Sequence, residues 1–377
     1  MDRKETGFWR ITRNMPLQMS VTVTQQSAIK GKGVRNIQKI SVIIPCYNVG
    51  YYIDRCLTSI MVQTIGSENL EIICIDDAST DDTWEHLQLW EQLYPEQILL
   101  LRQQMNGRQG KARNIGLSYA SANWVAFADA DDWLEPDYFK RLYDAAMRHE
   151  CDVAACGVRT DFSRTLSYFD EECRQWMDDQ YFVADSQEKI GVLFERRLLC
   201  EGPVAKLIRK KLLTEHDILF AEDVAYEDHY WLPLLYIYTK KIYVTGKNLY
   251  HYFVNPDSTS HSRNKAYHMD WITVHLMKWA EYERRGLWQE YRELLEGDAL
   301  YDAAGFVRML VLGYDEPSYS CFLLMSELIR RQIPAYEANP YAAKFPELYR
   351  QLLKALYVPA DKEVFCKIAE ALRTIYF

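Results

Sequence analysis

The stretch ISVIIPCYN, residues 40–48, opens with a run of β-branched side chains that Pro45 closes. A continuous apolar run of this length is typical of a strand buried on both faces of a sheet. Residues 70–75 and 124–128 have the same character, and they end at Asp76 and Asp129. Each of these three expected strands therefore leads directly into polar residues.

Helical patterns separate the expected strands. An apolar stripe with helical spacing runs from Tyr52 to Met61, and residues 79–82 carry the signals of a helix start. Strands alternating with helices predict an α/β fold, with a Rossmann-like, mostly parallel sheet that helices flank on both faces. Further strands are expected at 98–101 and 153–158, and further helices at 110–119 and 136–147.

The alternation stops after about residue 160. Helical patterns at 187–198 and 226–238 and short strand patterns at 242–244 and 250–254 follow, and the chain then continues as successive helices. We expect four parts: a loosely ordered leader at 1–38, an α/β core at 39–160, a second half of that domain at 161–264, and a helical C-terminal region at 265–377.

Composition narrows the class of protein. The net charge of −9 would repel a phosphate backbone, so nucleic acid is not expected as a partner. The nine cysteines have irregular spacings, which favours reduced thiols in a cytosol. The N-terminus lacks the apolar core of a signal peptide, and no run of 18 apolar residues occurs. These features predict a cytoplasmic protein.

Three polar clusters follow the expected strands: PCYN at 45–48, DDAS at 76–79 and DADD at 129–132. The carboxyl ends of parallel strands meet at one edge of an open α/β sheet, where ligands bind. The three carboxylates of the DADD cluster repel one another unless water or a cation neutralises them, and Mg²⁺ and Mn²⁺ prefer such oxygen ligands. An acidic helix start before Pro136, with Asp132 as its cap, is the alternative.

The stretch NGRQGKAR, residues 106–113, is a glycine-bearing turn with three cations ahead of an expected helix. Backbone N–H groups and the helix dipole at such a turn favour an anion. The spacing matches neither a Walker A loop nor a dinucleotide-binding GxGxxG turn. The pair Asp76 and Asp77 fits a hydrogen-bond acceptor for a nucleobase or ribose, and it fits a solvated turn equally well.

Taken together, four segments resemble glycosyltransferase family two in order and spacing: SVIIPCYN (41–48), ICIDDASTDD (73–82), GKARNIG (110–116) and FADADDW (127–133). The resemblance is strong over about residues 39–160 and looser to about 260. It implies a GT-A fold, a nucleotide-sugar donor, a divalent metal and inversion at the anomeric carbon.

The resemblance also implies roles for individual residues. Nucleotide-sugar contacts fall on Pro45, Tyr47, Asn48, Asp76, Asp77, Arg113, Asp129 and Ala130, with Asp77 on the base and Arg113 near it. Asp129 and Asp131 would hold Mn²⁺ or Mg²⁺. Glu227 and Asp228 resemble the family's Glu-Asp pair, which supplies the catalytic base, and we favour Asp228. The alternative is that both only complement a helix N-terminus.

The expected function is therefore inverting, non-processive transfer of a sugar to a hydroxyl of a saccharide or lipid-linked saccharide in surface polysaccharide synthesis. We expect the donor to be a UDP-sugar. A nucleotidyltransferase is disfavoured because residues 47–50 lack the glycine-rich, arginine-containing loop of that class. A catalytically inactive binding module would be expected to lose one of the carboxylates. Peripheral membrane attachment and a homodimer through the C-terminal helices stay open. Lys206 is either a surface lysine or a substrate contact, and His251 fits a packed histidine.

Overall fold

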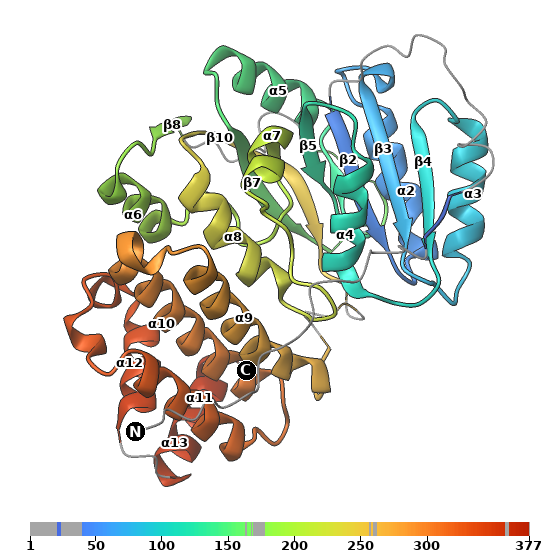
Figure 1. Ribbon diagram of the computed structural model, residues 1–377. Helices are drawn as coiled ribbons and strands as arrows, with labels where there is room; N and C mark the ends of the chain where they lie inside the picture. Colours follow the sequence, from blue (N-terminus) through green and yellow to red (C-terminus); the bar gives the residue numbers. More distant parts are fainter. Residues whose placement is uncertain are drawn as a thin grey trace, which may run out of the picture.

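The computed structural model describes residues 21–23, 40–162, 164–166, 168, 178–255, 258, 262–358 and 362–376. An α/β domain forms one half of the molecule and a helical C-terminal region packs against one side of it (Figure 1). Most of the expected leader 1–38 lies outside the described residues, but Val21–Val23 forms a short strand, β1.

A 10-stranded sheet organises the α/β domain. Four neighbouring strands, β4-β3-β2-β5, run parallel, as the sequence predicted. Antiparallel pairs β5·β9 and β7·β9 follow, so the sheet as a whole is mixed rather than mostly parallel. In spatial order the strands are β1 (Val21–Val23), β4 (Ile98–Gln103), β3 (Leu70–Asp76), β2 (Ile40–Cys46), β5 (Trp124–Phe127), β9 (Lys206–Arg209), β7 (Val153–Asp161), β10 (Lys241–Phe253) and β6 (Trp133–Leu134), with β8 (Gln180–Val183) paired to β10.

Each face of the sheet has its own apolar core because successive side chains of a strand point to opposite faces. In β2, Val42 and Ile44 belong to the cluster that α2, α3 and α5 cover, and Ile43 belongs to the cluster that α4 and α8 cover. The flanking helices are α2 (Gly50–Met61), α3 (Thr83–Leu93), α4 (Arg108–Tyr119), α5 (Tyr138–Arg148), α6 (Gln187–Arg196), α7 (Lys210–Glu215) and α8 (Glu227–Tyr238). The α/β fold class with helices on both faces is confirmed.

The C-terminal region is helical, as expected. It has a separate core around Leu300, Phe306 and Leu356, but Leu294 and Leu295 extend the sheet-side cluster of α8. The two halves therefore share buried surface. Its helices are α9 (Asp270–Arg284), α10 (Trp288–Leu312), α11 (Tyr319–Gln332), α12 (Glu347–Tyr357) and α13 (Lys362–Tyr376), with 3-10 turns at Ala266–Met269, Tyr336–Ala338 and Ala342–Lys344.

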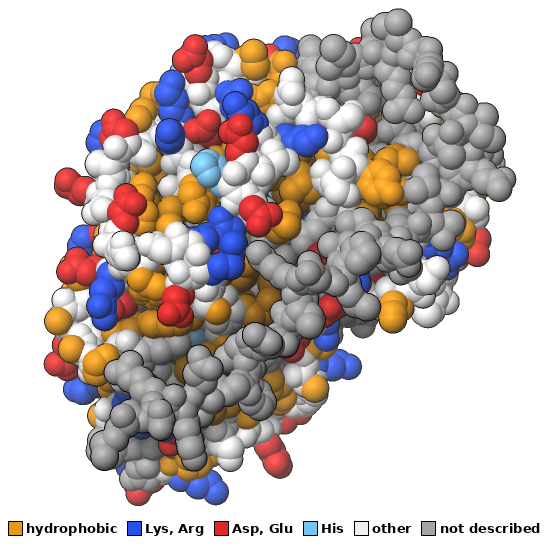
Figure 2. All heavy atoms as spheres, in the orientation of Figure 1, with side chains coloured by type: hydrophobic (Ala, Val, Ile, Leu, Met, Phe, Trp, Pro, Cys, Tyr) orange, Lys and Arg blue, Asp and Glu red, His pale blue; other side chains and the backbone are white. Residues whose placement is uncertain are grey.

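Three features of the fold bear on the expectations from sequence. The two short strands expected at 242–244 and 250–254 are one strand, β10, which register shifts interrupt between Val244 and Tyr250. The eight cysteines within the described residues are free thiols, five of them buried. In that same part of the chain, no helix combines the length and apolar character needed to cross a bilayer. On the face drawn in Figure 2, the described basic and acidic side chains are intermixed.

Candidate active site

The loops after β2 and β3 are bound to each other. Asn48 has a left-handed backbone, φ 53°, which turns its amide side chain toward the neighbouring loop. Its backbone N–H donates to Ser79 Oγ (3.1 Å), and its Oδ1 accepts from the Thr80 N–H (2.8 Å). Pro45 is buried within β2, whereas the Tyr47 ring is 46% exposed beside this junction. The first two polar clusters therefore form one continuous edge.

Asp76 and Asp77 are both buried, and they face different partners. Asp76 accepts from the Ser79 N–H (3.1 Å) and pairs with Arg102 Nε (2.9 Å). Asp77 Oδ1 accepts from the Gly107 N–H (2.7 Å) and from Gln103, so it ties the end of β3 to the loop before α4. Burial raises the pKa of Asp77 to about 6 although the Gly107 N–H opposes that shift.

The DADD cluster after β5 divides into groups with different environments. The Asp129 side chain is 28% exposed and accepts from Arg113 (2.8 Å). Ala130 is buried. Asp131 Oδ2 accepts from Asn255 Nδ2 (3.1 Å), and burial together with Asp129 raises the pKa of Asp131 to about 6. Asp129 and Asp131 are thus two carboxylates on one short turn, and among the described residues one side chain, Arg113 or Asn255, donates to each of them.

Asp132 has a structural role in this loop. It is 1% exposed, and it accepts from Tyr250 OH (2.6 Å) and from the Phe253 N–H (2.8 Å), both in β10. It does not cap the following helix, since Asp137 is the N-cap residue of α5. The alternative of an acidic helix start with Asp132 as cap is therefore wrong. Tyr250 OH also accepts from the Asp129 N–H (3.1 Å), which fixes the turn.

Arg113 connects the DADD turn to the start of α8. The side chain is 1% exposed, and its guanidinium donates to Asp129 (2.8 Å), to Gln109 Oε1 (2.9 Å) and to Glu227 Oε1. Burial lowers the pKa of Arg113, but Asp129 and Glu227 raise it more, so the cation is retained. The resemblance placed Arg113 near the nucleobase, whereas the structure places it between two carboxylates.

Glu227 and Asp228 open α8 and occupy different environments. Glu227 is buried against Arg113, and burial raises its pKa while Arg113 lowers it. Asp228 is partly exposed and lines a pocket between α8 and the C-terminal helices. The preceding Tyr226 has φ 63°, which turns the chain sharply into the helix. The Glu227 carboxylate therefore contacts Arg113, and Asp228 is part of the pocket wall.

Two other residues that the sequence singled out are structural. Lys206 is 0% exposed and donates to the carbonyl oxygens of Cys200 (2.9 Å) and Val204 (3.1 Å), so neither expected role is right. The sequence around Lys206 did not indicate that this side chain is buried in β9. The packing of His251 is confirmed, because its ring stacks on Trp133 at 4.7 Å and its Nε2 pairs with Glu135 (3.1 Å).

Sequence reasoning missed several partners of the site. Asn255 on Asp131 and Gln103 on Asp77 gave no signal, because amides at the ends of strands and in loops are common and their partners lie far away along the chain. Within the described residues, no group of three or more His, Cys, Asp or Glu side chains forms a complete metal cage. Mg²⁺ in proteins is usually held by one or two carboxylates together with substrate phosphates, so a pair such as Asp129 and Asp131 would need a substrate to complete a site.

Comparison with known proteins places this geometry in a family. The sequence profile of "Glycosyl transferase family 2" matches residues 41–215. Glycosyltransferase GlyA of Streptococcus pneumoniae is 31% identical over 59% of this chain and 31% of that protein. Poly(ribitol-phosphate) beta-glucosyltransferase of Bacillus spizizenii is 28% identical over 58% of this chain and 33% of that protein. The chain thus spans about a third of the length of these two relatives.

Among solved structures, the crystal structure of S. aureus TarS 1-349 in complex with UDP-GlcNAc aligns with a TM-score of 0.52 and 20% identity. The alignment covers 89% of this chain and 88% of that chain, so the likeness extends into the C-terminal helices. At this identity the comparison establishes the fold. Residues 41–215 are a glycosyl transferase family 2 domain, and the chain has the GT-A fold.

Proposed function

We propose that this protein is an inverting, non-processive, metal-dependent glycosyltransferase. Its donor in this proposal is a UDP-sugar, and its acceptor is a hydroxyl of a saccharide or lipid-linked saccharide in surface polysaccharide synthesis. Two relatives support that setting by their names: the poly(ribitol-phosphate) beta-glucosyltransferase of Bacillus spizizenii, and the poly(ribitol-phosphate) beta-N-acetylglucosaminyltransferase TarS of Staphylococcus aureus, which is 28% identical over 57% of this chain. The neighbouring fold with bound UDP-GlcNAc supports a uridine donor.

The observation that carries the proposal is the pairing of Arg113 with both Asp129 and Glu227. This contact brings the carboxylates after β5 next to the start of α8, although the two segments lie far apart in the sequence. A transferase needs such a junction, because the leaving diphosphate and the attacking hydroxyl must meet at one anomeric carbon. Family membership alone would not require this arrangement of buried side chains.

The donor site in this proposal follows the edge formed by the strand ends. Asp77 would accept from the base, and Pro45, Tyr47, Asn48, Asp76 and Ala130 would line the nucleotide and sugar. The side chain of Asp77 is already fixed by the Gly107 N–H and Gln103, so its position is set before a ligand arrives. Arg113 would act by holding Asp129 and Glu227 in place.

The residues present suit a divalent cation. Asp129 and Asp131 flank Ala130 on one turn, and their mutual repulsion contributes to raising the pKa of Asp131 to about 6. Most Asp131 carboxyl groups are ionised at pH 7, and a cation would relieve that repulsion. Asp129 and Asp131 would hold Mn²⁺ or Mg²⁺, which when bound supplies positive charge beside the leaving diphosphate.

The reaction then needs one base. The acceptor oxygen forms a bond to the anomeric carbon as the bond from that carbon to the diphosphate oxygen breaks, and the hydroxyl proton passes to Asp228. Attack from the face opposite the leaving group inverts the configuration. Asp228 suits this role better than Glu227, because Glu227 is held in an ion pair with Arg113. We place the activity in the cytoplasm, where nucleotide sugars are available.

A thermal-shift screen tests the donor and metal assignments together. UDP-, GDP-, CDP- and dTDP-sugars would be added with Mn²⁺, with and without EDTA. We expect one UDP-sugar to raise the melting temperature in a metal-dependent way, because a ligand that binds only the folded state stabilises it. Asp131→Asn should lose this shift, and Asp144→Asn, which removes an exposed carboxylate of α5, should keep it. An undiminished shift in Asp131→Asn, or in EDTA, would contradict the metal site.

A further inference from the structure

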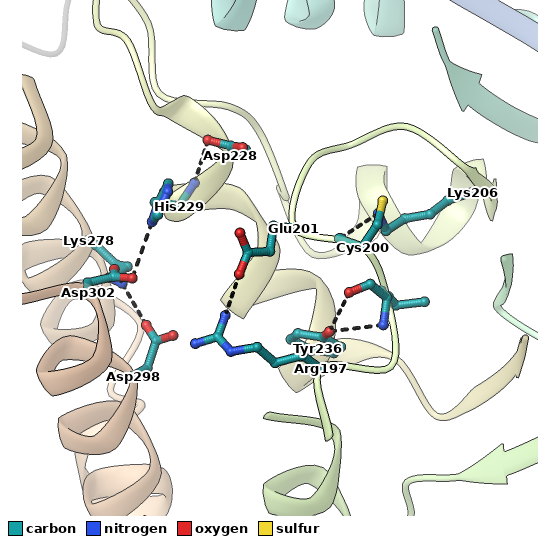
Figure 3. Close-up of polar contacts among 11 residues, drawn as sticks. Arg197, Cys200, Glu201, Lys206, Asp228, His229, Tyr236, Lys278, Asp298 and Asp302 are labelled. Carbon is teal, nitrogen blue, oxygen red and sulfur yellow. Dashed lines mark hydrogen bonds and ion pairs between the residues drawn. The ribbon is translucent and has the colours of Figure 1, made fainter. Parts of the chain in front are cut away.

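The pocket beside Asp228 lies where the α/β domain meets the C-terminal helices. Its walls come from α6, from the segment after it, and from α8, α9, α10 and α12. Asp228 and His229 of α8 lie on one side, and Asp298 and Asp302 of α10 lie on the other (Figure 3). None of the donor-site residues named above lines this pocket. Asp228, the proposed base, does.

Most charged groups around the pocket are paired with one another. His229 Nδ1 pairs with Asp302 (3.2 Å), and Lys278 of α9 pairs with Asp298 (2.6 Å) and with Asp302. Arg197, after α6, pairs with Glu201 (3.7 Å). Asp228 accepts only from the His229 N–H among the hydrogen bonds of the described residues. Arg308 of α10 also lines the pocket. The lining cations are then His229, Arg197 and Arg308, and they face four carboxylates, those of Glu201, Asp228, Asp298 and Asp302, so the walls carry no surplus positive charge for a phosphate.

Aromatic rings form much of the remaining surface. The Tyr301 ring stacks on Tyr349 at 4.4 Å, and the Arg197 guanidinium lies 3.5 Å from the Tyr301 centroid. The Trp271 ring packs 4.4 Å from His229. The Trp271 Nε1–H is buried, and within the described residues it has no hydrogen-bond partner. Buried polar groups normally have a partner, so an unpaired indole N–H on a residue of the pocket wall indicates a missing acceptor, such as a ligand oxygen.

We propose that this pocket binds the acceptor, and that the acceptor group it holds is a neutral saccharide. Aromatic rings in the wall offer apolar contact to the C–H surface of a sugar ring, and the convergent donors and carboxylates match its hydroxyl groups. Asp228, on the pocket wall, would receive the proton of the attacking hydroxyl. The C-terminal helices thus supply the acceptor site through Trp271, Tyr301 and Tyr349. This inference rests on the proposed glycosyltransferase function.

The test measures binding of four probes to the full chain by saturation-transfer NMR and fluorescence. The neutral probes are the methyl β-glycosides of glucose and N-acetylglucosamine and the disaccharide cellobiose, and glycerol 3-phosphate is the anionic probe. UDP binding in the presence of Mn²⁺ is measured on the same samples. We expect at least one neutral glycoside to bind and glycerol 3-phosphate not to bind.

Two variants locate the binding. Trp271→Phe keeps a ring and removes the N–H, and it should weaken glycoside binding about fivefold to tenfold, as expected for one lost hydrogen bond. The matched control Trp90→Phe, on α3, removes an indole N–H that donates to Asp54 at the surface and should bind like the wild type. Tyr301→Ala, which removes a ring, should weaken binding further.

The outcomes separate the two proposals. Equal glycoside binding by Trp271→Phe and wild type would overturn the pocket assignment, and so would binding of glycerol 3-phosphate in place of the glycosides. A failure of UDP to bind, with glycoside binding intact, would overturn the proposed function and leave the saccharide pocket standing. Loss of UDP binding in Trp271→Phe would show a damaged fold, and Tyr301→Ala would then decide the assignment.

Discussion

At the scale of single residues, Arg113 has the largest role in the candidate site. It is buried and neutralises one partly exposed and one buried carboxylate, Asp129 and Glu227, which would otherwise repel each other. The sequence placed Arg113 in a basic, glycine-bearing turn that favours an anion, and in the structure Arg113 pairs with two carboxylates. It could not predict that the anions are side chains of this chain, because Glu227 lies 114 positions away.

Replacing Arg113 with Met should destabilise the fold. Removing one partner of a buried ion pair leaves an uncompensated charge, which costs about 3–5 kcal/mol. Because water partly solvates Asp129, we expect a loss near the lower end of that range, about 3 kcal/mol. Urea unfolding measures the change. The control Arg141→Met, which breaks a surface pair with Asp137 on α5, should cost less than about 1 kcal/mol. Similar losses for both variants would contradict the central position of Arg113.

At the scale of secondary structure, α4 and the segment before α8 approach closely at Gly110. A Cβ atom at this position would lie 2.0 Å from the Ala221 carbonyl oxygen and 3.3 Å from Glu227 Cβ. The close approach explains why a helix with two glycines packs here, and it fixes the distance between α4 and the start of α8. Backbone, rather than a flexible side chain, would have to move to admit a larger residue.

We therefore expect Gly110→Ala to cost about 1–3 kcal/mol in stability, the range of overpacked sites, and to reduce turnover by displacing Glu227 and Asp228. The matched control is Gly202→Ala, since a Cβ at Gly202 meets no atom within 4 Å. Chemical denaturation and donor turnover check both variants. A fully active and stable Gly110→Ala chain would show that the contact between α4 and α8 is not needed.

The elements themselves were predictable where the pattern was strong. The apolar runs that became β2, β3 and β5 were placed within a residue or two, and so were their polar C-terminal ends. β9 was missed, because Leu207 and Ile208 alone between charged residues give too short a pattern. β10 was divided in two because Gly246 and Asn248 indicate a turn, whereas the strand accommodates them as register shifts. Tertiary pairing overrides local propensity at such places.

At the scale of the whole molecule, the C-terminal helices are joined to the α/β domain by a shared core and by buried charges. His229 of α8 pairs with Asp302 of α10, and Lys278 of α9 joins the same group. The sequence predicted these helices but not their attachment, since a lysine and two aspartates spaced along helices look like solvated faces. Whether these side chains are buried depends on which helices pack together, and the local sequence pattern does not indicate that packing.

This network predicts a dependence of stability on pH. Burial lowers the pKa of His229, but Asp302 and Asp228 raise it more than Lys278 opposes, to about 9. Its stabilising contribution is complete below the unfolded pKa near 6.5 and is lost as the pH rises through about 9, a change of about 3 kcal/mol. Unfolding measured from pH 6 to 9.5 should show this decline in the wild type and a flatter curve in His229→Gln. Parallel curves would contradict the assigned pair.

The most direct test of the central claim is Asp228→Asn, assayed for donor affinity and for release of UDP from the donor that the screen identifies. In the proposed reaction, α8 presents Glu227 to Arg113 and Asp228 to the acceptor hydroxyl. We therefore expect Asp228→Asn to leave the dissociation constant for the donor unchanged and to lower turnover about 10²–10⁴-fold, the usual contribution of a general base. Turnover equal to that of the wild type would contradict the role of Asp228 as the base.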